Sequence, residues 1–262
     1  MTTKALVVLS GGQDSTTCLF WAKQTYDEVH AITFDYGQRH IIEIEAAVKV
    51  AKMANVASHE IVQVPSCLIS KSPLTDKSQV LETYENAEQM DSTIGERREL
   101  TFVPMRNALF LTIAANRAEA LGIPNIVTGV CQMDNANYDD CRMVFIQATE
   151  RYINTALGHD HRGTQPISIV TPLIYLDKAA SVQWAFDIAG CWEALAYSHT
   201  SYDGKYPPTG MNHSNVLRAD GFEKAGLPDP LVLRAVVEGL MEKPTTANYS
   251  DEALERSRSY VR

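Results

Sequence analysis

Residues 10–15 read Ser-Gly-Gly-Gln-Asp-Ser and are the part of this 262-residue chain best suited to bind phosphate. They follow an apolar run typical of a strand and precede a segment that can be helical. Glycines at 11 and 12 let the backbone approach a ligand closely and adopt positive φ. The N–H groups of the turn, the positive end of the helix dipole and the hydroxyls of Ser10 and Ser15 would face anionic oxygens. The spacing therefore predicts a site for a polyphosphate.

Two widespread phosphate loops do not fit this spacing. No Gly-Lys-Ser or Gly-Lys-Thr closes the turn, which argues against a Walker A loop. The turn also lacks Gly-x-Gly-x-x-Gly, which argues against dinucleotide binding. A tight strand–helix turn with a serine cap is the remaining alternative, and the place of the turn after the first strand disfavours it.

Two further clusters of polar side chains follow in the chain. The first, residues 34–40, ends a predicted strand and is richer in polar groups than a loop needs, although a solvated turn before the next helix is an alternative. The second, residues 103–107, contains Arg106, whose forked guanidinium could bind phosphate or carboxylate. An exposed arginine at a helix start is the alternative there.

The third cluster, residues 128–142, follows another predicted strand. Asp134 and Asp140 could accept hydrogen bonds from the amino and imino edge of a guanine-like base, and Arg142 could pair with a carboxylate. The two cysteines of this cluster could be nucleophiles, but no histidine is close to either in the sequence. Inert packing is therefore the favoured interpretation of both thiols.

Alternating strands and helices must position these clusters. This order is typical of an α/β protein with a doubly wound parallel sheet, whose ligands bind beyond the carboxyl ends of the strands. Residues 66–100 are polar and irregular, and a loop of that length is usually a functional flap. Residues 197–230 are rich in glycine and proline. We predict strands at 5–9, 28–35, 58–64, 125–130 and 167–171, and helices at 14–23, 41–53, 105–120, 145–157, 178–189, 229–242 and 250–260.

Composition narrows the class of protein. Apolar residues make up 45% of the chain, which supports a normal buried core. A net charge of −9 argues against a general nucleic-acid-binding surface. The five scattered cysteines form no Cys-x-x-Cys pair and are typical of free thiols in a reducing compartment. Because no apolar run approaches the ~20 residues of a membrane span and no signal segment precedes Ser10, we expect a cytoplasmic protein.

Taken together, these segments resemble the 7-cyano-7-deazaguanine synthase family (preQ0 synthases, QueC) of the N-type ATP pyrophosphatase, or PP-loop, superfamily. The resemblance implies an adenine nucleotide alpha hydrolase-like, Rossmann-like fold. An ATP pyrophosphatase domain would span residues 1–195, and a small region of loops and helices would span 196–262. The likeness rests on the loop at 10–15, Phe-Asp-Tyr-Gly-Gln-Arg-His at 34–40, Val-Pro-Met-Arg-Asn at 103–107, the cluster at 128–142, Thr171–Leu173 before Lys178, and Val-Leu-Arg at 216–218.

The family cleaves ATP between its α- and β-phosphates to adenylate the carboxylate of 7-carboxy-7-deazaguanine. Ammonia then gives an amide, and more ATP converts the amide to a nitrile. The resemblance thus implies an ATP-dependent carbon–nitrogen ligase that uses Mg²⁺ and forms a homodimer. Its catalytic residues would be Asp14, Ser15, Arg106 and Lys178. These same residues except Lys178 would also contact ATP, together with Leu9, Ser10, Gly11, Gly12, Gln13, Thr33, Phe34 and Gly129. The substrate would contact Tyr36, Gln38, Asn107, Cys131, Asp134, Tyr138, Asp140 and Arg142.

The chain departs from the family near its C-terminus. The resemblance implies a structural zinc site of four cysteines there, but hydroxyl and amide side chains stand at those positions, and they are poor zinc ligands. We therefore expect no structural zinc. His199 and His213 are nearby, and we interpret them as solvated loop histidines, as we do the pair His159 and His161. The four positions are Ser201, Thr209, Asn212 and Asn215.

The substrate region departs from the family as well. Cys131 stands where the family usually has asparagine, Ala136–Asp139 replace Ser-Gly-Tyr-Pro, and Val144 replaces a glutamate. An altered acceptor site leaves a second function open, in which the activated deazaguanine is joined to a protein amine, for example in antiphage defence. A non-catalytic nucleotide sensor is an alternative of another class, which the intact Asp14, Ser15 and Arg106 argue against.

Overall fold

The computed structural model describes residues 2–39, 42–64, 68, 70–133 and 137–261. At the centre of these residues lies a parallel sheet with the strand order β3-β2-β1-β4-β5. The chain moves outward from β1 to β3 and then returns to the other side of β1, so the winding direction reverses between β1 and β4. This is the doubly wound parallel sheet that the sequence predicts. The strands are β1 (Lys4–Val8), β2 (Glu28–Asp35), β3 (Ser58–Gln63), β4 (Asn125–Val127) and β5 (Ser168–Val170).

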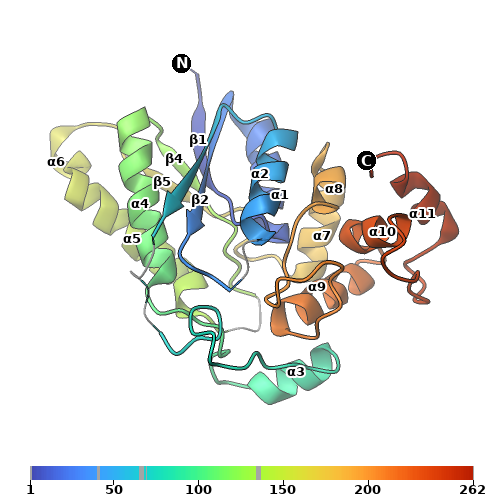
Figure 1. The fold of residues 1–262 in the computed structure, drawn as a ribbon. Coiled ribbons are helices and arrows are strands. Elements are labelled where there is room, and N and C mark those ends of the chain that lie inside the picture. The colour runs from blue at the N-terminus through green and yellow to red at the C-terminus, as the bar shows by residue number, and fades with distance from the viewer. Residues whose placement is uncertain (1, 40–41, 65–67, 69, 134–136, 262) are drawn as a thin grey trace.

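Helices cover both faces of the sheet (Figure 1). Ala5 and Val7 of β1 belong to one buried cluster and Leu6 to the other, because successive side chains of a strand point to opposite faces. Burial on both faces explains why the strand reads as a continuous apolar run. The first cluster includes α1 (Gln13–Thr25), α2 (Ile42–Met53), α7 (Lys178–Asp187) and α8 (Cys191–Leu195); the second includes α4 (Arg106–Leu121) and α5 (Met143–Leu157).

Two helices lie beyond the carboxyl ends of the strands, at the bottom of Figure 1. These are α3 (Ala87–Ile94) and α9 (His213–Lys224), which pack against each other through a small apolar cluster. Helix α9 also packs along α7, and its Phe222 joins the buried cluster of β1. The other helices are η1 (Asp139–Cys141), α6 (His159–Arg162), α10 (Pro230–Val237) and α11 (Asp251–Ser257). None of the helices in the described residues combines the length and apolar character needed to cross a membrane.

The sequence analysis did not predict helices α3 and α9: it expects an irregular loop over 66–100, and it places no helix within the glycine- and proline-rich residues 197–230. Each begins at an asparagine, Asn86 or Asn212, whose side chain accepts a hydrogen bond from a backbone N–H of the first turn. Strands β4 and β5 are shorter than predicted, with three residues each. The predicted helix start at residue 41 lies outside the described residues.

Candidate active site

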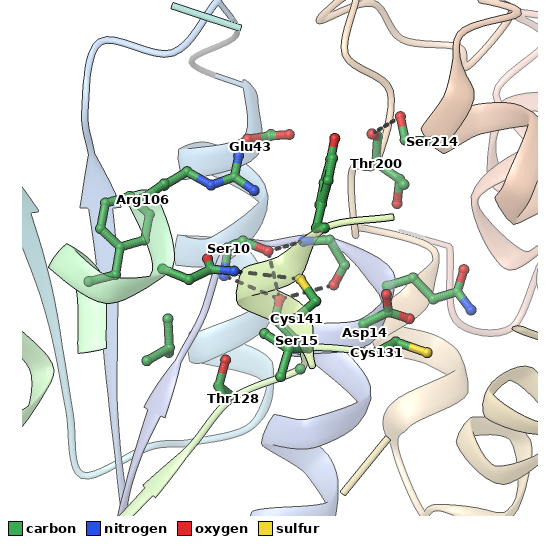
Figure 2. Close-up of a pocket in the computed structure, with 18 of the residues that line it drawn as sticks. Ser10, Asp14, Ser15, Glu43, Arg106, Thr128, Cys131, Cys141, Thr200 and Ser214 are labelled. Carbon is green, nitrogen blue, oxygen red and sulfur yellow. Dashed lines mark hydrogen bonds between the residues drawn. The ribbon is translucent and has the colours of Figure 1, made fainter. Parts of the chain in front are cut away.

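A cavity of about 290 Å³ is lined by residues that follow β1, β2 and β4, where the winding of the sheet reverses. Open α/β sheets bind their ligands at this position. Figure 2 shows two sides of the cavity: Asp14 and Ser15 of α1 lie on one, and Glu43 and the guanidinium of Arg106 lie on the other. The loop at 10–15 and the three clusters at 34–40, 103–107 and 128–142 all contribute to its walls.

Hydrogen bonds within the loop at 10–15 hold its shape. The Ser15 hydroxyl lies 3.0 Å from the Ser10 hydroxyl and donates to the Gly12 carbonyl oxygen at 3.2 Å. The Ser10 backbone N–H donates to the Ser15 hydroxyl at 3.2 Å. Among the described residues, no side chain caps α1 at Gly12. The N–H groups of the first turn of α1 therefore remain available to an anion, as helix N-termini generally are.

The two loop glycines have different roles. The φ angle of Gly11 is +86°, and a Cβ atom there would lie only 2.3 Å from the backbone oxygen of Glu43 on α2. Gly11 thus permits close packing of the loop on α2, and it does not line the cavity. Gly12 lines the cavity but is extended, with φ −80°. The expected positive φ therefore occurs at Gly11 and not at Gly12.

Gly129, which follows β4, packs against the loop from the other direction. A Cβ atom at this position would lie 3.0 Å from the Ser15 backbone nitrogen and 3.0 Å from the Asp14 carbonyl carbon. A larger residue would therefore push the β4 segment away from the start of α1. Gly129 lines the cavity, and its expected contact with ATP stays a prediction.

Asp14 and Lys178 join α1 and α7 beside the loop. Lys178 Nζ lies 2.9 Å from Asp14 Oδ2, and the lysine side chain is 10% exposed. Asp14 and Glu43 are the acidic residues that line the cavity among the described residues, and Asp14 is the one at the start of α1. Mg²⁺ is commonly held by one or two carboxylates together with phosphate oxygens. The residues therefore fit a phosphate-bound Mg²⁺, for which Asp14 would be the protein ligand.

The opposite side of the cavity carries Glu43 and Arg106. Arg106, the first residue of α4, directs its guanidinium toward Glu43 of α2 (Figure 2). Its Nη1 donates a long hydrogen bond to the Tyr36 hydroxyl at 3.5 Å. Burial raises the pKa of the Glu43 carboxyl to about 8, and the positive charge of Arg106 opposes this rise. This side can therefore offer both a hydrogen-bond acceptor and a cation.

Aromatic rings form the walls near these charges. The rings of Phe34 and Phe110 stack with their centroids 4.2 Å apart. The Tyr36 ring centroid lies 5.4 Å from that of Phe110. Tyr138 and Tyr202 also line the cavity. Flat aromatic walls with a few polar groups suit a planar heterocycle.

Asp140 is buried and does not line the cavity in this structure, so its expected contact with the base stays a prediction that the structure does not support. It lies in η1, is 8% exposed, and accepts a hydrogen bond from the Asn107 backbone N–H at 3.4 Å. Burial raises its pKa. The 3₁₀ turn directs this side chain to the start of α4, whereas Arg142, two residues later, lines the cavity. Asp134 lies outside the described residues.

Other predicted residues divide between cavity and core. The Thr33 hydroxyl donates to the Leu9 carbonyl oxygen at 2.6 Å, and Thr33 does not line the cavity. Cys131 lines the cavity, and its thiol donates to the Leu176 carbonyl oxygen at 3.0 Å, which fits a packing role. The other predicted residues that line the cavity are Leu9, Ser10, Gln13, Asp14, Ser15, Phe34, Tyr36, Gln38, Arg106, Asn107, Tyr138, Arg142 and Lys178.

The sequence analysis missed a wall that the C-terminal region contributes. The backbone N–H of His199 donates to the Gly11 carbonyl oxygen at 2.8 Å and so joins this region to the phosphate loop. Arg218 is 2% exposed and pairs with Asp229 at 2.6 Å, and it also donates to the Thr200 hydroxyl at 2.9 Å. The Val-Leu-Arg motif at 216–218 could have indicated that this region contributes to the cavity. The missed residues of this wall are His199, Thr200, Tyr202, His213, Ser214, Leu217 and Arg218.

The positions at which the resemblance implies zinc-binding cysteines form hydrogen bonds instead. The Asn212 side-chain amide donates to the Ser201 hydroxyl at 2.9 Å, and this hydroxyl donates to Asp203 Oδ1 at 2.7 Å. The Asn215 amide donates to the Gly210 carbonyl oxygen at 2.7 Å. Within the described ranges, no group of three or more His, Cys, Asp or Glu residues could hold a metal ion.

The expectation of solvated histidines is wrong for three of the four residues. His199 and His213 are 3% and 4% exposed, because the C-terminal region packs onto the phosphate loop and α9 covers it. Burial lowers the pKa of His199, and its Nε2 lies 3.0 Å from the Ser201 carbonyl oxygen. His159 is also buried and lies 3.3 Å from the Glu119 carboxylate. His161 is exposed, as predicted.

Comparison with known proteins gives the family. The model described as "Queuosine biosynthesis protein QueC" matches residues 4–226. The chain is 45% identical over 230 residues to the 7-cyano-7-deazaguanine synthase of Gloeobacter violaceus, over 87% of this chain and 95% of the relative. It is 46% identical over 237 residues to the protein of the same name from Chromobacterium violaceum, over 90% of this chain and 95% of the relative. A solved 4-thiouridine synthetase–RNA complex with bound ATP is similar over 84% of this chain and 53% of that one, at 16% identity and a TM-score of 0.45. Because the family model matches most of the chain and the relatives share nearly half of the aligned residues, the protein belongs to the QueC family.

Proposed function

We propose that this protein converts 7-carboxy-7-deazaguanine to 7-cyano-7-deazaguanine with ATP and ammonia. Its curated relatives carry the name of that activity. The observation that carries the proposal is the cavity itself, with a glycine-rich loop and helix N-terminus on one side and half-buried ionisable residues among aromatic rings on the other. One side suits a polyphosphate and the other a planar base with polar edges.

In this proposal the loop at 10–15 binds the β- and γ-phosphates of ATP. Lys178 neutralises part of their charge, and Asp14 holds Mg²⁺, which stabilises the leaving pyrophosphate when bound. Arg142 contacts the carboxylate of the substrate. That carboxylate is an anion, and it needs a nearby cation to approach the polyphosphate without strong repulsion.

The chemistry proceeds through two activations. An oxygen of the substrate carboxylate attacks the α-phosphorus of ATP, and pyrophosphate leaves. Ammonia attacks the acyl carbon, AMP leaves with one carboxylate oxygen, and a proton is lost to give the primary amide. A second ATP activates the amide oxygen in the same way, and loss of AMP and the two amide protons gives the nitrile. A substituted amide lacks the second N–H proton and would stop at the first stage.

Product analysis tests the proposal. We expect the purified protein with ATP, Mg²⁺, ammonium and 7-carboxy-7-deazaguanine to release the nitrile, AMP and pyrophosphate, with about two AMP per nitrile. A protein that carries an added 7-amido-7-deazaguanine would instead indicate transfer to a protein amine. Pyrophosphate release that does not depend on the deazaguanine would contradict the substrate, and ADP as the nucleotide product would contradict the bond cleaved.

The family resemblance also supports finer expectations. We propose that the protein acts as a homodimer in the cytoplasm and that the C-terminal region over 196–262 stands in for the zinc-binding segment. Light scattering after size exclusion tests the dimer, and a monomer at micromolar concentration would contradict it.

A further inference from the structure

Glu43 is an ionisable residue of the cavity to which the proposed reaction assigns no role. Among the described residues, no hydrogen bond or ion pair reaches its carboxylate, and it forms no ion pair with Arg106. Both side chains line the cavity, and Figure 2 shows the guanidinium directed toward the carboxylate. Glu43 is half-buried, and a partly desolvated carboxylate without N–H donors is less favourable than one that has them. The cavity is therefore complementary to a ligand that brings donors to Glu43.

The six-membered ring of a deazaguanine has such donors. Its edge presents an exocyclic amino N–H, a ring N–H and a carbonyl oxygen in a row. A carboxylate can accept from the first two with its two oxygens, and a neighbouring guanidinium can donate to the third. Tyr36 contacts both Phe110 and the Arg106 guanidinium, so aromatic walls that suit a flat ring stand beside this pair of charges.

We infer that Glu43 and Arg106 together recognise the donor–donor–acceptor edge of the deazaguanine, with Glu43 selecting the 2-amino group. This inference rests on the proposed function and takes the place of the role that the sequence analysis gave to Asp140. Glu43 comes from α2 and Arg106 from α4, on opposite faces of the sheet, so the edge is read where these two helices begin.

The adenine of ATP is a poorer match to the same pair. Its edge offers one N–H toward a carboxylate, and the neighbouring ring nitrogen is an acceptor. The second oxygen of Glu43 would then face a lone pair, with no donor to offset its desolvation. A 2-amino-4-oxopyrimidine edge provides a donor for each oxygen.

Binding measurements with paired ligands test the inference. The ligands are 7-carboxy-7-deazaguanine, its analogue without the 2-amino group, and α,β-methylene-ATP, each titrated calorimetrically into wild type, Glu43→Gln, Arg106→Met and Glu45→Gln. Glu45 is exposed on the same helix and is the matched control. Removal of the 2-amino group should weaken binding to wild type and to Glu45→Gln by about 10- to 100-fold, the usual effect of losing a hydrogen bond to a charged group.

Glu43→Gln should bind 7-carboxy-7-deazaguanine about 10- to 100-fold more weakly and discriminate between the two deazapurines by less than about threefold. Arg106→Met should weaken both deazapurines by the same factor, because both keep the carbonyl oxygen. Discrimination is a ratio measured on one variant, so a partial loss of folded protein does not alter it. Undiminished discrimination by Glu43→Gln would overturn the inference, as would a loss confined to α,β-methylene-ATP, which would assign Glu43 to adenine. If wild type neither binds nor converts 7-carboxy-7-deazaguanine, the proposed function itself fails.

Discussion

The pairing of Asp14 with Lys178 concentrates charge at the start of α1, where the phosphates of ATP are expected to bind. The pair joins residues 164 positions apart, at 2.9 Å, beside helix N–H groups that have no intrahelical acceptor. An ion pair in this position can fix the lysine for contact with phosphate and still present a carboxylate oxygen to a metal ion. Loss of the carboxylate would therefore affect the reacting phosphates more than the fold.

Asp14→Asn should lower the rate of pyrophosphate release by about 100- to 1000-fold, the range found when a group that stabilises developing charge is removed. The melting temperature should change little, because the amide keeps the shape of the side chain. Asp187→Asn, at an exposed site on the helix that carries Lys178, is the control and should keep full activity. Normal turnover by Asp14→Asn would remove this residue from the mechanism.

The pH dependence of deazaguanine binding follows from Glu43. Burial raises the pKa of its carboxyl to about 8, and Arg106, Tyr36 and Tyr202 are the ionisable groups that face it. Burial raises the pKa of both tyrosines, so they stay neutral near pH 8. Below pH 8 the carboxyl is protonated and must lose its proton to accept two N–H donors. The affinity should therefore fall as the pH drops, by about tenfold per unit well below 8.

This prediction is checked by dissociation constants measured from about pH 6 to pH 8 in buffers of different ionisation enthalpy. Wild type should release a proton on binding at the low end of this range, and Glu43→Gln should show neither the slope nor the proton release. An identical slope in both proteins would assign the titration to the ligand or to another residue.

Asp140 and Glu43 illustrate what sequence reasoning can and cannot reach at the scale of residues. Asp140 is close in sequence to Arg142 and to predicted site residues, but a 3₁₀ turn aims its side chain at the start of α4. Glu43 reads as an ordinary polar position of a helix. Its place in the cavity depends on the close packing of α2 on Gly11, which is a contact between distant parts of the chain.

At the scale of elements, buried strands were predictable from continuous apolar runs, and the long helices from apolar residues that recur at helical spacing. Strand β2 has the predicted bounds, and α4 differs by one residue at each end. Helix α9 is held by polar contacts as well as by the buried Val216 and Phe222. Its Arg218 reaches Asp229, Ser198 and Thr200 at 2.6 to 2.9 Å. Such contacts leave no periodic signal in the sequence.

The hydrogen-bonded cluster ahead of α9 should make the C-terminal region independent of zinc. Asn212 caps α9, donates to Ser201 and accepts from the Ser214 hydroxyl at 2.7 Å. Asn212→Ala should therefore lower the free energy of unfolding by about 1–3 kcal/mol, since buried partners lose their hydrogen bonds. A strong chelator should leave the melting temperature of wild type unchanged. Elemental analysis that finds one zinc per chain would contradict this prediction.

At the scale of the whole molecule, the cavity is lined by segments that lie far apart in sequence, and three of them contact one another beyond the strand ends. The phosphate loop forms one wall, and the C-terminal wall packs on it through His199. Residues 70–104, which we call the cover segment, reach the cavity through Leu74 and carry α3 onto α9. The sequence predicts a flap over 66–100, but not its docking on α9, because that contact has no local signature.

A few hydrogen bonds to other parts of the chain hold the cover segment in place. The Leu74 carbonyl accepts from the Arg39 N–H at 3.1 Å, and the Tyr84 N–H donates to the Met211 carbonyl at 2.8 Å. The Asn137 amide donates to the Gly95 and Arg97 carbonyl oxygens, both at 3.0 Å. A segment with few regular backbone hydrogen bonds opens more readily than the sheet and its helices.

Ligands that fill the cavity should therefore slow hydrogen exchange in the cover segment. We expect amides of residues 70–104 to exchange at least several-fold more slowly with α,β-methylene-ATP and 7-carboxy-7-deazaguanine bound, because ligand contacts with the cavity walls favour the closed arrangement. Helices α10 and α11 lie away from the cavity and serve as the internal control, with unchanged exchange. Peptide-level mass spectrometry measures both regions in one sample. Equal protection of the two regions would indicate global stabilisation, and no protection of 70–104 would show that this segment does not respond to the occupied site.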